Sequence, residues 1–373
     1  MDVLEQLLVY VKDIVTQNII DSNLASNGSQ ANAWAFYAFY GAGLVLLSCI
    51  MTTYYGTGAM GSGVAEVIGY INGVNYPLAI CIQTTITKIF GVVLAVAGGL
   101  AVGKEGPLAH IGANFGAAFV YLPGYEFCQN DRSKRQYIAA GASAGVSVAF
   151  GAPIGGALFM YELSRENPAW DFRLLWKTFV SCASAVFALG LFDNALHGKS
   201  IDWSESSLKF AKPQKDVTTP TSVIGGALVI GLVSGLLGAF FINVNFRING
   251  YRAKLQDYLT HRTAAQKEAG NKDAWTWNNK IKLFEAFMFA FLTASCFYWV
   301  PFNWASCVSN SDARLDKTLQ VKTDSIFDKS EDYDVTRGWC PEGAHNPLAT
   351  MLWKTEGGLI KHMMDMDPLM SKL

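Results

Sequence analysis

Long stretches of this 373-residue chain contain no Asp, Glu, Lys or Arg, and this feature constrains the fold more than any other. Several of them exceed the roughly 20 residues that an α-helix needs to cross the core of a bilayer. The uncharged stretches cover residues 34–65, 89–103, 108–125, 138–161, 178–192, 217–246 and 286–311. The chain as a whole is 51% apolar and 16% charged. We therefore expect a polytopic membrane protein of the all-α class.

Glycine and proline interrupt these apolar stretches, so we expect tilted and broken helices of unequal length. Irregular backbone at membrane depth is tolerated only where it is buried or lines an aqueous cavity, and such breaks mark candidate binding sites. The small residues also let neighbouring helices approach closely. The expected helices cover residues 34–54, 77–103, 108–122, 138–150, 154–162, 174–191, 221–246 and 281–300.

Charge distribution divides the chain and orients it. The segment 246–282 contains eight basic and three acidic residues, so the positive-inside rule predicts a cytoplasmic loop there. The segment 312–342 contains five basic and eight acidic residues and is expected on the opposite side. We expect four parts: an amphipathic or partial membrane helix (1–33), a transmembrane domain (34–300), an outer or lumenal loop (301–350) and the start of a truncated continuation (351–373).

The first motif that suggests chemistry is Gly61-Ser62-Gly63, which precedes a short apolar segment. Glycines on both sides of a serine permit a tight backbone approach, and a helix that starts there directs unpaired amides and its positive dipole end at an anion. The Ser62 hydroxyl can donate to the same anion. Gly-Ser-Gly is also an ordinary loop sequence, so the motif alone leaves both interpretations open.

The second motif, Gly103-Lys104-Glu105-Gly106-Pro107, places an ion pair between two long apolar stretches. Ionisable residues at membrane depth are costly and usually serve a function. Pro107 suits the first turn of the next helix. A carboxylate at that helix N-terminus competes with an anion for the same position, which predicts a gate at Glu105. The alternative is a Lys104–Glu105 pair at the membrane surface.

Other classes of function have little support. The five histidines form no H-E-x-x-H motif, and the seven cysteines show neither C-x-x-C nor a Cys/His metal spacing, so we expect no metal, no cofactor and no enzyme activity. Residues 141–145 fit the G-x-S-x-G pattern around Ser143, but a nucleophile elbow requires a preceding strand, whereas these flanks indicate a membrane helix. No basic cluster suggests a nucleic-acid partner.

Three motifs in this order, G-S-G-V-A-E (61–66), G-K-E-G-P-L-A-H-I-G-A (103–113) and A-F-G-A-P-I-G-G-A-L-F (149–159), resemble the N-terminal signatures of eukaryotic CLC chloride channels and chloride/proton antiporters. The segment 340–349 resembles that family's outer loop. The resemblance runs from about residue 61 to residue 361. It implies a CLC-like membrane domain, here incomplete, that forms homodimers with a pore in each subunit.

The resemblance also implies roles for individual residues. Ser62 would coordinate the central anion, with Gly63 and Gly106 in the anion-binding loops, and the serine at position 62 implies a preference for chloride. Lys104 would add positive potential, and Glu105 would be the gate of a voltage-gated type of chloride channel. The partners implied are chloride and the lipid bilayer of a plasma or organelle membrane, together with a second copy or a chain that supplies the missing half.

Two departures from the family pattern affect the expected function. Ala65 stands where proline is usual, and Leu163, after Glu162, stands where the antiporters carry a proton-relaying glutamate. An apolar residue there favours a passive channel. The alternatives are a chloride/proton antiporter and a non-conducting structural or regulatory subunit.

Two of the seven cysteines, Cys307 and Cys340, lie in or beside the predicted outer loop. An oxidising exterior or lumen permits disulfides, so we expect a disulfide between them.

Overall fold

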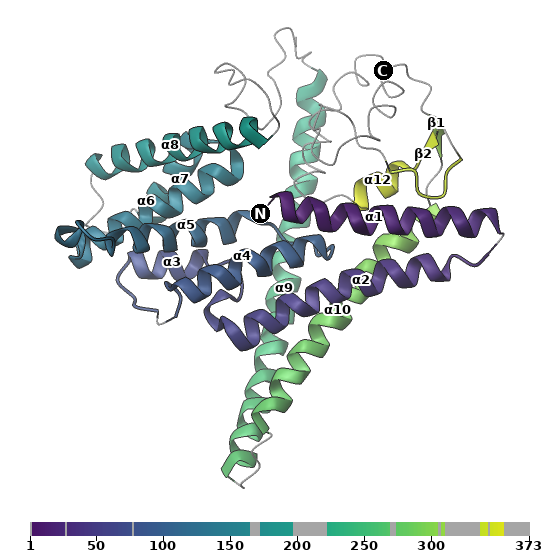
Figure 1. Ribbon diagram of the computed structural model, residues 1–373, viewed down its shortest axis with the longest axis horizontal. Helices are drawn as coiled ribbons and strands as arrows, with labels where there is room; N and C mark the ends of the chain where they lie inside the picture. Colours follow the sequence, from purple (N-terminus) through teal and green to yellow (C-terminus); the bar gives the residue numbers. More distant parts are fainter. Residues whose placement is uncertain are drawn as a thin grey trace. The chain divides into compact units, whose positions relative to one another are not determined.

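The computed structural model describes residues 2–26, 28–76, 78–164, 172–196, 222–268, 274–304, 307–309, 336–341 and 344–353. Within these ranges the structure is almost entirely helical (Figure 1). The helices are α1 (Asp2–Ala25), α2 (Ala31–Ile50), α3 (Val64–Ile71), α4 (Ile82–Ala97), α5 (Glu105–Val120), α6 (Asp131–Phe150), α7 (Pro153–Ser164), α8 (Phe172–Leu196), α9 (Ser222–Glu268), α10 (Ala274–Trp304) and α12 (Pro347–Trp353). A single π-turn, Met51–Tyr55, extends α2. Two-residue strands β1 (Val308–Ser309) and β2 (Ala344–His345) pair antiparallel.

The chain divides into two compact units. One comprises Met1–Ala211 and Ala286–Leu373, and the other comprises Lys212–Glu285. Four helical segments are long and apolar enough to cross a membrane by length and composition: Ala31–Tyr55, Leu174–Phe192, Ile224–Leu255 and Asn279–Trp304. The predicted all-α polytopic class is confirmed.

Aromatic residues build the core between α2, the C-terminal part of α10 and α12. The Trp34 indole donates to the Ser295 hydroxyl at 3.1 Å, and its ring lies 5.7 Å from that of Phe291 in an edge arrangement. Tyr37 packs between Tyr298 and Trp353, with ring centroids 6.0 and 5.2 Å away. Such pairs add stability beyond the area that they bury. This cluster fixes the end of α10 and the short α12 against α2.

Glycines bring α5 and α6 into direct backbone contact, and Figure 1 shows the two helices side by side. A Cβ at Gly112 on α5 would fall on the carbonyl oxygen of Gly141 on α6, and one at Gly116 would fall on that of Tyr137. A Cβ at Gly145 on α6 would meet the Leu108 carbonyl. The close helix packing expected from the small residues is therefore present at this pair.

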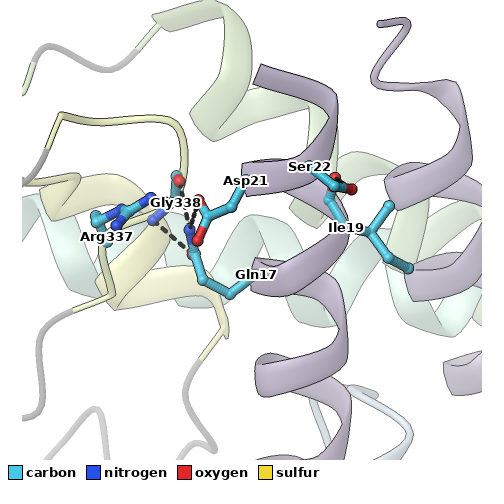
Figure 2. A network of polar contacts seen from close by, with 6 residues as sticks. All are labelled: Gln17, Ile19, Asp21, Ser22, Arg337 and Gly338. Carbon is cyan, nitrogen blue, oxygen red and sulfur yellow. Dashed lines mark hydrogen bonds and ion pairs between the residues drawn. The ribbon is translucent and has the colours of Figure 1, made fainter. Parts of the chain in front are cut away.

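Helix α1 is attached to the segment around Arg337 and Gly338 by polar contacts (Figure 2). The Gln17 amide donates to the Gly338 carbonyl at 3.0 Å and accepts from the Gly338 N–H at 3.1 Å. Asp21 forms an ion pair with Arg337. For residues 1–33 the sequence is compatible with two alternatives, an amphipathic helix and a partial membrane helix. The structure has a 24-residue helix, with Ile20 fully buried in the aromatic core.

Two expected boundaries differ from the structure. The charged segment 246–282 was predicted as a loop, but α9 continues through it to Glu268 and α10 begins at Ala274. Residues 251–268 contain no glycine or proline and are rich in good helix formers, so helix propensity continues after the apolar stretch ends. The helix expected over 77–103 is shorter. Cys81 caps the start of α4, and Gly99 adopts a left-handed conformation (φ 87°) just after its end.

Candidate functional site

The Gly61-Ser62-Gly63 motif forms a tight turn that leads into α3. Both glycines have positive φ angles, 74° and 83°, which a side chain disfavours. Helix α3 begins at Val64, and its first backbone bond runs from the Val67 N–H to the Gly63 carbonyl at 3.1 Å. The amides of the preceding turn have no intrahelical partner. Ser62 is exposed and lies directly before this helix N-terminus.

The second motif forms the N-terminus of α5 and meets the first motif there. Lys104 is the N-cap residue, Glu105 opens the helix and Pro107 occupies its first turn, where its missing N–H costs no hydrogen bond. A Cβ at Gly106 would fall on the Ser62 hydroxyl oxygen. The structure therefore brings Ser62, Gly63, Lys104, Glu105 and Gly106 to one place, where the N-termini of α3 and α5 converge.

A buried lysine lies behind the serine turn, and the sequence motifs assign it no role. Lys88 on α4 is 1% exposed, and its Nζ donates to the Ser62 carbonyl at 3.3 Å. The same Nζ lies 2.5 Å from Nδ1 of His110 on α5, which is fully buried. A Cβ at Gly63 would overlap both Lys88 and His110, so only glycine fits this position.

The hydrogen bonds of His110 determine its tautomer. Its Nε2 lies 2.9 Å from the Ala79 carbonyl oxygen, which only accepts, so Nε2 carries the proton. Nδ1 of the neutral ring then accepts from the Lys88 ammonium. His110 is thus a neutral partner that holds the Lys88 Nζ in place beside the Ser62 turn.

Three groups contribute positive potential at this place, and the carboxylate of Glu66 in the first turn of α3 offsets part of it. A buried ammonium and two helix N-termini all favour a negative charge next to Ser62. Glu105 lies at the same helix N-terminus with its side chain half-buried, and no hydrogen bond or ion pair to its carboxylate occurs within the described ranges. A small anion and the Glu105 carboxylate are therefore both suited to this position.

The other predicted site residues lie elsewhere. Glu162 is exposed near the end of α7, and the side chain of Leu163 lies outside the described residues. Cys307 and Cys340 are joined by a disulfide, with their Cα atoms 5.6 Å apart. Ser143 is buried inside α6 and donates to the Ala139 carbonyl at 2.9 Å. No three His, Cys, Asp or Glu side chains in the described ranges gather as metal ligands would.

One signal in the sequence points to Lys88, which the motif-based prediction of the site had missed. Lys88 is the only charged residue in the apolar sequence of α4, Ile82–Ala97. An ionisable residue in such a helix is expensive and indicates function. His110 stands inside the second motif but carries no comparable signal, because its contact with Lys88 depends on how α4 and α5 pack.

Known proteins match this chain over most of its length. The family model described as voltage-gated chloride channel matches residues 44–353. Chloride channel protein C of Dictyostelium discoideum is 31% identical over 89% of this chain and 41% of its own length. The H(+)/Cl(−) exchange transporter 7 of Homo sapiens is 28% identical over 95% of this chain and 44% of its own length. The chain thus spans less than half the length of these relatives.

A comparison with solved structures finds a eukaryotic CLC transporter with a TM-score of 0.47 and 21% identity. That match covers 76% of this chain and 46% of the solved chain.

Proposed function

Because this chain belongs to the voltage-gated chloride channel family, we propose that it forms part of a chloride pathway across a membrane. Ser62 binds the anion, with the backbone of Gly63 and Gly106 beside it, and Glu105 is the gate. The observation that carries this proposal is the contact of the Ser62 turn with the first turn of α5 at Gly106, directly after Glu105.

The proposed anion position is supported by three sources of positive potential. The Lys88 ammonium donates to the Ser62 carbonyl from behind, and the N-termini of α3 and α5 approach from two sides. Lys104 adds a fourth positive group at the start of α5. A fixed ammonium and unpaired amides attract chloride without any need for catalytic groups, so we propose transport and no enzyme activity.

The gating role of Glu105 follows from competition for this position. When its carboxylate occupies the positive region, it excludes chloride by charge and by volume. When it is protonated or displaced, the anion takes its place. Conduction then depends on pH and on voltage, because both change the occupancy of the site by the carboxylate.

Passive conduction is our preferred mode, since Leu163 offers no proton-carrying group. Coupled exchange with protons is the second candidate, because relatives that match 95% of this chain carry the name H(+)/Cl(−) exchange transporter 7. The chain spans 44% of the human exchange transporter 7 and 41% of chloride channel protein C. We propose that it works as a homodimer or together with a chain that supplies the remaining helices; the alternative is a non-conducting subunit.

Anion flux in liposomes that contain the purified chain tests the proposal. We expect chloride efflux after a chloride gradient is imposed, and we expect this efflux to drive no proton movement against a proton gradient. Proton movement coupled to chloride movement would show that the chain works as a chloride/proton exchanger. If correctly folded protein gives no flux, either alone or with added C-terminal helices of a relative, that result would favour the non-conducting subunit.

A further inference from the structure

Helix α1 carries two charged residues on its buried face. Glu5 and Lys12 are seven residues apart, which is two helical turns, so they lie on the same side of α1. They are only 4% and 2% exposed. Buried charges are costly unless they are paired, so each requires a partner on a neighbouring element.

Glu5 reaches the residue next to the proposed gate. Its carboxylate oxygen lies 3.6 Å from the Lys104 Nζ, with the two side chains 6% and 27% exposed. This separation exceeds that of a good hydrogen bond, so the attraction between the two charges accounts for the contact. Lys104 is the N-cap of α5, where the helix dipole repels a cation. The Glu5 carboxylate offsets that repulsion.

Other charged groups on α1, α3, α4 and α5 surround the proposed site or lie close to this pair. Lys12 of α1 stacks over the Tyr37 ring, 4.8 Å from its centroid, and reaches the turn at Gly99. Glu105 follows Lys104 directly on α5. Lys88 of α4 lies behind the Ser62 turn and contacts His110. Glu66, in the first turn of α3, is a further acidic residue, and its charge acts on Lys88 and His110. Glu5 thus adds its negative charge directly beside Lys104.

From this placement we propose that Glu5 is a positioning residue of the anion site. It holds the Lys104 ammonium and cancels part of its positive potential, so chloride at Ser62 is bound more weakly than the lysine alone would bind it. Weak binding favours fast release, which conduction requires. This inference rests on the proposed anion site, but it concerns affinity and does not depend on whether the chain conducts unaided.

Calorimetric titration of the purified full chain with chloride tests the inference. The Glu105→Gln background removes the competing carboxylate, and gluconate keeps the ionic strength constant. In this background we expect Glu5→Gln to tighten chloride binding roughly three- to tenfold, because the full charge of Lys104 then acts on the anion. Lys104→Met should weaken binding by a similar factor. With Lys104→Met present, Glu5→Gln should change the affinity by less than twofold.

Two variants separate a positioning role from a structural one. Glu126 is an exposed glutamate in the turn before α6, and Glu126→Gln should leave chloride affinity unchanged. Glu5→Asp keeps the charge on a shorter side chain, so its chloride affinity should lie between that of the unsubstituted background and that of Glu5→Gln. It serves as the test if Glu5→Gln misfolds.

The outcomes distinguish this inference from the proposed function. Equal chloride affinity with and without the Glu5 carboxylate would overturn the inference, while flux in liposomes would still support conduction. If Glu5→Gln binds chloride more tightly but the liposomes show no chloride flux, the inference is retained and unaided conduction is refuted. No chloride binding by any variant would refute both.

Discussion

At the scale of single residues, Glu105 carries the most specific expectation, because it directly precedes Gly106, which contacts Ser62. We expect Glu105→Ala to remove the gate, so that chloride efflux no longer changes with pH or voltage. The matched control is Glu126→Ala at an exposed turn, which should keep both dependences. Liposome flux at several pH values and membrane potentials gives the measurement. Retained pH dependence in Glu105→Ala would refute the gate.

Ser62 is expected to set anion preference. Ser62→Pro removes the hydroxyl donor but keeps the unpaired amides of the α3 N-terminus. We therefore expect the preference for chloride over nitrate to fall, by at most roughly tenfold, which is about the value of one hydrogen bond to an anion. Permeability ratios measured before and after the substitution are the test. Identical ratios would remove Ser62 from the anion site.

The sequence predicted one part of this site and missed another. Ser62 and Glu105 stand in short motifs whose glycines and proline indicate helix starts, so local chemistry was sufficient to select them. Lys88 and His110 are 22 residues apart, and their 2.5 Å contact exists only after α4 packs against α5. No local pattern encodes that pairing. The same is true of Glu5 and Lys104, which are separated by about a quarter of the chain.

At the scale of helices, the contact of α5 with α6 tolerates no side chain at its closest points. Gly112→Ala would place a methyl group on the Gly141 carbonyl and separate the two helices. We expect a loss of about 1–3 kcal/mol in stability. Gly43→Ala on α2 is the matched control, since no heavy atom of the described residues lies within 4 Å of that Cβ. It should be neutral or slightly stabilising. Thermal unfolding in detergent compares the two, and equal midpoints would contradict the packing argument.

Helix identity was predictable from apolar stretches, but helix ends were not. The expected segment 138–150 begins at Asp131 in the structure, where Asn130 caps α6 by accepting from the Arg132 N–H at 2.8 Å. Capping depends on individual side chains and so is invisible to a hydropathy pattern. Helix α9 extends to Glu268 because charged residues with high helix propensity follow its apolar part. Apolar length therefore gives the membrane part of a helix and not its full extent.

At the scale of the whole molecule, the disulfide and the α1 contacts hold the segment around residues 337–340 to the rest of the fold. Cys307 and Cys340 are 33 residues apart, and closing such a loop stabilises the protein by about 4 kcal/mol in the chain-entropy model. Cys307→Ser should lower the unfolding midpoint, whereas Cys296→Ser at an exposed position on α10 should not. Under denaturing conditions, five thiols should react before reduction and seven after it. Seven reactive thiols without reduction would exclude the bridge.

Proton coupling depends on the whole pathway, and we expect chloride to move without stoichiometric proton transport. Leu163 cannot exchange protons, and Glu162 is exposed at the end of α7. Adjacent helical residues point about 100° apart, so Glu162 is a poor substitute for a proton-accepting group at position 163.

A chloride gradient across sealed vesicles should therefore leave the signal of a trapped pH dye unchanged. Addition of a proton ionophore to the same vesicles serves as the control that the dye responds to protons. Uphill proton movement would overturn passive conduction. If that movement then disappeared in Glu162→Gln but persisted in Glu126→Gln, Glu162 would be the proton-accepting group. If it persisted in both, the protons would have to use another residue, and Glu105 would be the first candidate because it lies at the proposed anion site.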